Sequence, residues 1–259
     1  MIGIASGMWM PVSSAALPNS QGQEPHRLTA YYESGAIPIH FRATDLLRDG
    51  DNLVGFRNGG AAGALFNAAV RGAVSTDGDW ITVSDTGAAL TLPHPADLQG
   101  ARLFMVVRNL TLTGDPGLVG HTELTEAGTR GINNEGNTVL RIRASGAVAL
   151  RNRVGSWSGS DIPIAANWSG LTLLEVALHP TEIRARSGGD VDVVLPLSTA
   201  MQARFASLLL SEIASGGSVT GARGDYGDIV SVLIDHPDYD TACAEVRAYL
   251  RSKYESAAA

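Results

Sequence analysis

The chain has 259 residues, a formal net charge of −7 at pH 7, 30 glycines and one cysteine. The acidic balance argues against nucleic acid or an anionic membrane surface as a partner, and no stretch approaches the roughly 18 apolar residues of a membrane span. One cysteine excludes an intrachain disulfide, while the many glycines and the low share of charged residues (17%) favour a turn-rich β protein.

Residues 1–27 differ from the rest of the chain and predict an N-terminal arm and linker. Trp9 stands between Met8 and Met10 in an apolar stretch, and a polar segment follows. No lysine or arginine precedes this stretch, and glycine and proline interrupt it, so we expect no secretion signal and synthesis in the cytoplasm. The three side chains either pack on their own domain or dock into another subunit, and burying each would stabilise by roughly 1.5–3 kcal/mol.

From residue 28 onward, β-branched, aromatic and aliphatic runs between turns predict a series of short strands. The run at 101–108 is the most apolar and is expected to be central. Ser145-Gly146 and Gly188-Gly189 predict hairpin turns. The expected strands lie near 28–32, 37–41, 53–56, 65–68, 80–84, 90–92, 101–108, 117–121, 139–144, 148–153, 171–178, 182–187, 191–195, 207–213 and 229–234.

Four arginines alternate with apolar residues along the two strands of the predicted hairpin at Ser145-Gly146. Residues of one strand alternate between the two faces of a sheet, so these arginines are expected to share one solvent-facing side. They are Arg141, Arg143, Arg151 and Arg153.

The C-terminal stretch predicts a closing strand and one helix. The apolar run 229–234 ends at Pro237, and Ala242, Val246 and Leu250 then follow at helical spacing, which predicts a helix over about 240–255. Cys243 falls inside this helix and is expected to be a small core residue.

Two stretches resemble one fold family. The sequence Gly-Asp-Ile-Val-Ser-Val-Leu-Ile-Asp at 227–235, followed by a helix ending in Tyr-Leu-Arg-Ser-Lys-Tyr at 249–254, is similar to the closing segment of concanavalin A-like (laminin G-like) jelly-roll domains of bacterial and phage proteins. The Asp-Gly-Asp turn at 49–51, before a strand with Phe56 in place of the usual Trp, resembles their opening. The resemblance implies an all-β, two-sheet antiparallel jelly-roll sandwich with one C-terminal helix, as a single domain at 28–259 behind the arm.

The motifs of catalysis on this fold are not found in the sequence. Glycoside hydrolases of this fold carry Glu-x-Asp-x-x-Glu or a close variant on one strand, which brings two carboxylates into one cleft. The chain has no Glu-x-Asp, although Asp225 and Asp228 leave an acid pair of another origin open. The sequence contains neither the histidine and cysteine spacing of a zinc site nor a recognisable Ser-His-Asp arrangement. We therefore expect a protein that is not an enzyme.

Clustered aspartates suggest calcium as the one plausible ion, since carboxylate oxygens are its preferred ligands. The alternative is ordinary Asp-Gly turn chemistry, and apart from calcium no cofactor is expected. The candidate ligands are Asp49, Asp51, Asp235 and Asp238.

Sugar binding needs an aromatic ring to stack on a pyranose and polar groups to meet the hydroxyls. The best candidate is the stretch 152–161, where Trp157 is set among serines and glycines in what reads as a polar loop; the alternative is that Trp157 packs back on the sheet. The candidate residues are Trp157, Asn152, Arg153, Asp161, Asn133, Asn134 and Asn137.

The resemblance implies a non-enzymatic carbohydrate-binding protein, a spike or fibre component of a phage or gene-transfer-agent particle that recognises bacterial surface polysaccharide. In this hypothesis the arm attaches a homo-oligomer to other particle subunits, and the protein acts on the particle surface. Two alternatives stay open: a structural or oligomerisation module without sugar binding, and a polysaccharide-degrading enzyme.

Overall fold

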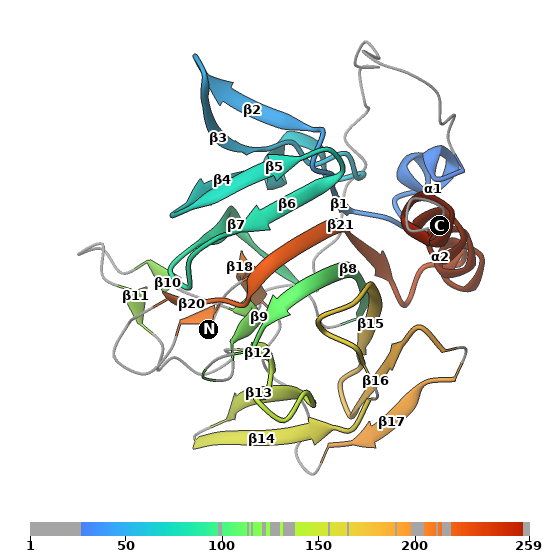
Figure 1. Cartoon of the computed structure of the whole chain (residues 1–259). Coiled ribbons are helices and arrows are strands. Elements are labelled where there is room, and N and C mark those ends of the chain that lie inside the picture. The colour runs from blue at the N-terminus through green and yellow to red at the C-terminus, as the bar shows by residue number, and fades with distance from the viewer. Residues whose placement is uncertain are drawn as a thin grey trace, which may run out of the picture.

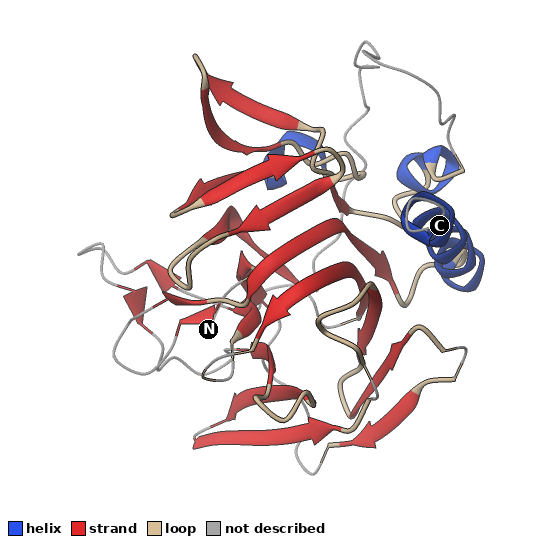
Figure 2. Ribbon diagram, in the orientation of Figure 1, coloured by secondary structure: helices blue, strands red, loops and turns tan. Residues whose placement is uncertain are grey.

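The structure is a computed structural model that describes residues 27–97, 100–112, 114, 116–120, 123–124, 130–131, 138–154, 156–164, 166–189, 191–197, 205–210, 212–213 and 219–255. These residues form a two-sheet antiparallel jelly-roll sandwich with a long C-terminal helix, which confirms the predicted fold class (Figure 1). Figure 2 shows strands throughout the body, with the helices α1 (Thr29–Glu33) and α2 (Tyr239–Glu255), labelled in Figure 1, together on one side of it. Among the described residues, no helix is long and apolar enough to cross a membrane.

Sheet A contains the predicted central strand, β8. Its spatial order in the described residues is β17 (Val193–Pro196), β16 (Glu182–Ser187), β15 (Thr172–Leu178), β8 (Ala101–Thr111), β21 (Arg223–Leu233), β6 (Trp80–Val83) and β5 (Val74–Asp77), and β1 (Ile39–Phe41) also pairs with β21.

Sheet B lies against sheet A. Its order in the described residues is β14 (Ser156–Ile162), β13 (Val148–Val154), β12 (Thr138–Ile142), β9 (Gly117–Gly120), β18 (Phe205–Leu209), β7 (Ala89–Asp97), β4 (Ala68–Arg71), β3 (Asn52–Phe56) and β2 (Leu46–Asp49). Two short pairs lie outside both sheets: β10 (Glu123–Leu124) with β11 (Arg130–Gly131), and β19 (Glu212–Ile213) with β20 (Val219–Thr220).

Sheet A is buried on both faces around the middle of β8, which explains why the consecutive residues Leu103–Val107 are all apolar. Leu103, Met105 and Val107 join the core between the sheets. Phe104 and Val106 alternate with them and join a second core under the helices α1 (Thr29–Glu33) and α2 (Tyr239–Glu255). From α2 the second core receives Ala242, Cys243, Val246, Leu250 and Tyr254. The predicted helix at about 240–255 and the core position of Cys243 are both confirmed.

The predicted strand at 28–32 is wrong, because this segment forms α1. Leu28, Tyr31 and Tyr32 are β-forming residue types, but their spacing also fits one face of a helix. Leu28 is buried in the second core, and both tyrosines pack against that core. Packing against α2 and sheet A therefore overrides the local strand preference.

Two other predicted strands are divided. The strand expected at 65–68 is a 3₁₀ turn, η1 (Gly63–Phe66), followed by β4. The strand expected at 207–213 is interrupted at Leu210, whose φ of 64° is left-handed and cannot continue a strand. The chain leaves sheet B there, and β19 then lies against β9 and β12.

Candidate functional site

The predicted polar loop at 152–161 is in fact strand. Residues 148–154 and 156–162 pair as the antiparallel hairpin of β13 and β14, and β14 is an edge strand of sheet B. The alternation of small polar residues with Trp157 and Asp161 fits a strand as well as a loop. The sequence interpretation missed this because it weighed the serines and glycines as turn residues.

The two faces of this hairpin are defined by the pair of Val148 and Ile162, both fully buried in the core between the sheets. Because residues of a strand alternate between faces, positions 149, 151 and 153 of β13 and 157, 159 and 161 of β14 share the outer face of sheet B. The cross-strand pairs on this face are Ala149 with Asp161, Arg151 with Gly159 and Arg153 with Trp157.

Strand β12 extends this outer face. Arg141 is the cross-strand partner of Ala149, and Arg143, just beyond β12, donates from Nε to Oδ1 of Asp161 at 3.1 Å. We call this set of positions, which the backbone register places on one side of sheet B, the arginine face. It consists of Arg141, Arg143, Arg151, Arg153, Trp157, Gly159 and Asp161.

The arginine face confirms that positions 141, 151 and 153 share one side of the sheet, but the expectation of uniform solvent exposure is wrong. Arg141 is 9% exposed and counts among the buried charged residues. Arg143 and Asp161 are more open, with side-chain exposures of 30% and 53%. Ala149, the cross-strand partner of both Arg141 and Asp161, is fully buried, so the inner part of this face is covered and only its edge at β14 is open at Asp161.

The structure separates the predicted sugar-binding residues into three groups. Trp157, Arg153 and Asp161 fall on the arginine face. Asn152 pairs with Ser158 at the alternate positions, which belong to the opposite face of the hairpin. The remaining candidates, Asn133, Asn134 and Asn137, lie outside the described residues, as do Met8, Trp9 and Met10 of the arm.

The four candidate calcium ligands lie in two separate turns. Asp49 and Asp51 are exposed at the turn between β2 and β3. Asp235 and Asp238 lie between β21 and α2, where the backbone oxygen of Asp238 accepts from the Ala242 amide at 2.8 Å and from the Thr241 hydroxyl at 2.9 Å. In the described part of the chain, no group of three or more His, Cys, Asp or Glu could hold a metal ion.

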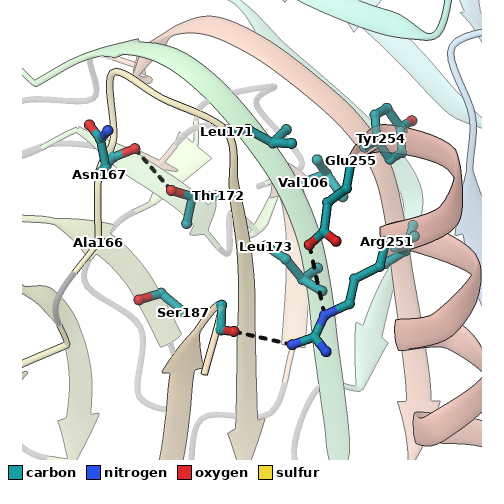
Figure 3. A pocket seen from close by; sticks show the side chains of 12 residues that line it. Val106, Ala166, Asn167, Leu171, Thr172, Leu173, Ser187, Arg251, Tyr254 and Glu255 are labelled. Atoms are coloured by element: carbon teal, nitrogen blue, oxygen red, sulfur yellow. Dashed lines mark hydrogen bonds and ion pairs between the residues drawn. The ribbon is translucent and has the colours of Figure 1, made fainter. Parts of the chain in front are cut away.

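A pocket of about 290 Å³ lies between α2 and the loop that precedes β15 (Figure 3). Leucine and valine side chains contribute to its lining, and Arg251 extends over it from α2, with its Nη2 donating to the backbone oxygen of Gly188 at 3.1 Å. Glu255 is the one carboxylate in this lining, so a two-carboxylate glycosidase mechanism would lack its second acid here. The lining residues are Val106, Ala166, Asn167, Leu171, Thr172, Leu173, Ser187, Gly188, Leu250, Arg251, Tyr254 and Glu255.

Asp228, left open as a catalytic acid, lies fully buried beneath α2. Its carboxylate accepts from His40 Nε2 at 2.9 Å, from the Tyr249 hydroxyl at 2.7 Å, from Lys253 at 3.0 Å and from the Tyr254 hydroxyl at 2.7 Å. Burial by itself raises the pKa of Asp228, but the bond and charge of His40, the charge of Lys253 and the Tyr249 bond outweigh it and hold that pKa far below its usual value. This carboxylate therefore stays ionised and joins the helix to the sheet.

Asp225 belongs to a different group of contacts. It accepts from Thr82 at 2.8 Å, and from Arg108 and Asn109 at 3.0 Å each. Burial raises the pKa of its carboxyl, but the bonds from Asn109, Thr82 and Arg108 outweigh burial, so the pKa is lowered. The suggested acid pair is thus two carboxylates with separate hydrogen-bond donors.

A second buried ionic cluster was missed by the sequence interpretation. Glu175 accepts from Arg102 and Arg186 at 2.8 Å each, and Arg247 of α2 bonds both of its oxygens, at 2.7 and 2.9 Å. Asp192 joins the cluster through Arg102 and Arg186. The sequence did contain a signal for this cluster. Arg102 and Glu175 are charged residues inside two otherwise strongly apolar strands, β8 and β15.

No protein-family model and no curated protein sequence matches the chain. Among solved structures, it is similar to domain 4 of AbnA, a GH43 extracellular arabinanase from Geobacillus stearothermophilus, in complex with arabinotriose, with 13% identity, a TM-score of 0.46 and coverage of 76% of this chain and 92% of that one. A CBM40 of a Ruminococcus gnavus IT-sialidase gives 13% identity and a TM-score of 0.44, with 60% and 92% covered. LamAcat from Zobellia galactanivorans gives 10% identity and a TM-score of 0.39, with 62% and 79% covered. Sequence identities and TM-scores this low do not indicate which ligand this chain binds or whether it has an activity.

Proposed function

We propose that the protein is a non-enzymatic carbohydrate-binding protein whose glycan lies on the arginine face. The observation that carries the proposal is the cross-strand pairing of Trp157 with Arg153 on the face that also holds Asp161. An aromatic ring offers a stacking surface for a pyranose, while arginine donates to hydroxyls and aspartate accepts from them. A sheet positions such groups more rigidly than a loop does.

Access is best at the edge of this face that carries Asp161, because Ala149 and Arg141 on the inner strands are 0% and 9% exposed. The helices α1 and α2 cover the outer face of sheet A, whereas Asp161 on the outer face of sheet B is exposed. Of the carboxylates beneath α2, Asp228 is surrounded by Lys253 and tyrosine hydroxyls, and Glu175 by arginines. Binding at the arginine face needs no movement of these clusters.

The experiment is a pull-down of the purified full chain on bacterial cells, with and without their capsule or other surface polysaccharide. Trp157→Ala and Arg153→Ala are each compared with the parent protein. Arg184→Ala, which removes an arginine from β16 of sheet A, is the matched control. We expect polysaccharide-dependent binding that both test variants lose and the control keeps. Equal, negligible binding by all four proteins would favour the structural or oligomerisation module instead.

We further propose that the protein lies on the surface of a phage-like particle and is attached to it through the apolar residues Met8, Trp9 and Met10. It is supported by the composition of the arm alone. The measurement is whether the full chain sediments with particles purified from producing cells, and whether Trp9→Ser releases it. A protein recovered only free of particles, for both versions, would contradict this attachment and leave the sugar-binding proposal in place.

A further inference from the structure

We propose that β17, the edge strand of sheet A, pairs with β17 of a second copy of this chain, so that the two copies share one sheet across a two-fold axis. The inference does not rest on sugar binding, and it concerns a different part of the molecule from the arginine face. Figure 1 shows β17 on the outer side of β16, where the described part of sheet A ends.

The first step is the direction of the backbone groups of β17. The Leu197 amide donates to the backbone oxygen of Thr181 at 2.8 Å, and the register of β16 and β17 continues from this bond. In an antiparallel pair every second residue bonds to the partner strand, so Leu195 and Val193 also bond to β16 and Val194 does not. The N–H and C=O of Val194 therefore point to the open edge, where such groups can pair with a further strand.

The second step is the apolar character of this edge. Val194 is 47% exposed, and Val191, just before the strand, is 82% exposed. Val193 and Leu195 face the core between the sheets but are only partly buried there. A further strand beside β17 would cover side chains on both faces of the sheet, and removing this apolar surface from water is favourable.

The third step is charge. Edge strands are commonly kept apart by exposed charged side chains. Two other edge strands follow this rule: β2 carries exposed Arg48 and Asp49, and β5 ends in exposed Asp77. Between residues 191 and 197 the one charged residue is Asp192, whose carboxylate is paired with two arginines of its own chain. The edge at β17 therefore presents no uncompensated charge to a partner strand.

The fourth step identifies the partner strand as a second β17. A two-fold axis at Val194 places this residue opposite its own copy, Val193 opposite Leu195, and Asp192 opposite Pro196. No like charges lie opposite each other in this register, and opposed like charges are what destabilises such pairs. Pro196 has no N–H, so the shared ladder is short. Pairing about a two-fold axis uses the free edge of both copies, so the assembly closes as a dimer.

The first test is sedimentation equilibrium of the full chain over a range of protein concentrations. We expect a monomer–dimer equilibrium. Val194→Lys places two cations opposite each other at the axis and is expected to weaken self-association by about tenfold or more. Val54→Lys is the matched control, because Val54 is 43% exposed but lies on β3 of sheet B, and it should leave the equilibrium unchanged. Thermal unfolding of each variant checks that it folds.

The second test fixes the register with a short thiol-to-thiol cross-linker. The proposed pairing places the two Cα atoms of residue 194 about 5.5 Å apart and those of residue 191, six residues apart along the ladder, about 20 Å apart. Val194→Cys is therefore expected to give a covalent dimer and Val191→Cys to give none, although position 191 is the more exposed. The parent protein is the blank, because its one cysteine, Cys243, is buried.

Each other result overturns the inference. A monomer at every concentration would do so, as would a dimer that Val194→Lys leaves unchanged. Preferential cross-linking of Val191→Cys would show a different register and exclude pairing about Val194. A monomer that copurifies with another protein, and loses it in Val194→Lys, would assign the edge to that partner in place of a second copy. None of these measurements involves a glycan, so the sugar-binding proposal is judged separately by the pull-down.

Discussion

Tyr254 and Asp228 are joined by two hydrogen bonds. The Tyr254 hydroxyl donates to Oδ1 of Asp228 at 2.7 Å and accepts from the backbone N–H of the same residue at 2.8 Å. Tyr254 lies near the end of α2, and Asp228 lies in the middle of β21, so the contact joins the last turns of the helix to sheet A. Burial and the neighbouring carboxylate raise the pKa of Tyr254, which keeps its phenol protonated as a donor.

Tyr254→Phe is therefore expected to destabilise the protein by about 1–3 kcal/mol, because a buried N–H and a buried carboxylate each lose a partner. The measurement is urea unfolding followed by circular dichroism. The ring itself remains in phenylalanine, so its packing against Trp80, at 4.9 Å between centroids, is kept. A change below about 0.5 kcal/mol would mean that water replaces the lost hydroxyl.

Gly227 is expected to be required for the same contact. A Cβ added there would lie 2.6 Å from Cζ of Tyr254 and 2.8 Å from its hydroxyl oxygen, so Gly227→Ala must displace the ring. We expect a loss of about 1–3 kcal/mol in the free energy of unfolding. Gly189→Ala is the matched control, because a Cβ there meets nothing within 4 Å. Equal stability of the two variants would show that α2 adjusts without strain.

Asp228 should make folding stability dependent on acid pH. Its pKa in the folded protein lies below the usual 3.8, so the carboxylate contributes stability above that pH, and this contribution is lost as the pH falls through the folded-state value. Asp228→Asn is expected to cost about 3–5 kcal/mol near neutral pH, because Lys253 loses its buried partner. Unfolding free energies measured between pH 7 and pH 2 should fall less steeply for the variant. Parallel curves for the two proteins would contradict the assignment.

The sequence predicts the sandwich well because alternation and turn residues are local signals. The positions of β8, β15 and α2 follow from such signals, since each is a long apolar or periodic run. The helix α1 could not be predicted in this way, because Leu28 and Tyr32 fit a strand and a helix alike, and the choice depends on packing against α2. The break at Leu210 likewise depends on how β18 leaves the sheet.

The candidate site was predictable only in part. Alternation alone indicated that Arg151 and Arg153 share a face. That Trp157 lies opposite Arg153 could not be read from the sequence, because the register of β14 depends on where the hairpin turns. The ionic clusters around Asp228 and Glu175 each include a pair more than 70 positions apart, His40 with Asp228 and Arg247 with Glu175, and a single sequence has no local signal for such pairs.

Glu175→Gln tests the second ionic cluster. Glu175 is 2% exposed and meets three arginines, so its neutral isostere leaves their charges with fewer buried partners. We expect a loss of about 3–5 kcal/mol in unfolding free energy, smaller in the double variant with Arg247→Gln than the sum of the two single losses. Strict additivity of the two changes would show that the pair is not coupled.

Cys243 provides a direct probe of how firmly α2 is held. It is the only cysteine of the chain, is buried on the inner side of α2, and burial raises the pKa of its thiol to about 12. Only the thiolate reacts with alkylating reagents, so labelling of the native protein at pH 8 is expected to be slow and to proceed through opening of the helix. Tyr254→Phe and Gly227→Ala should both accelerate labelling, because they weaken the contact that holds the last turns of α2. Gly189→Ala should leave the rate unchanged. Fast labelling of the parent protein, at the rate of a free thiol, would show that α2 opens readily and that the Asp228 cluster does not hold it.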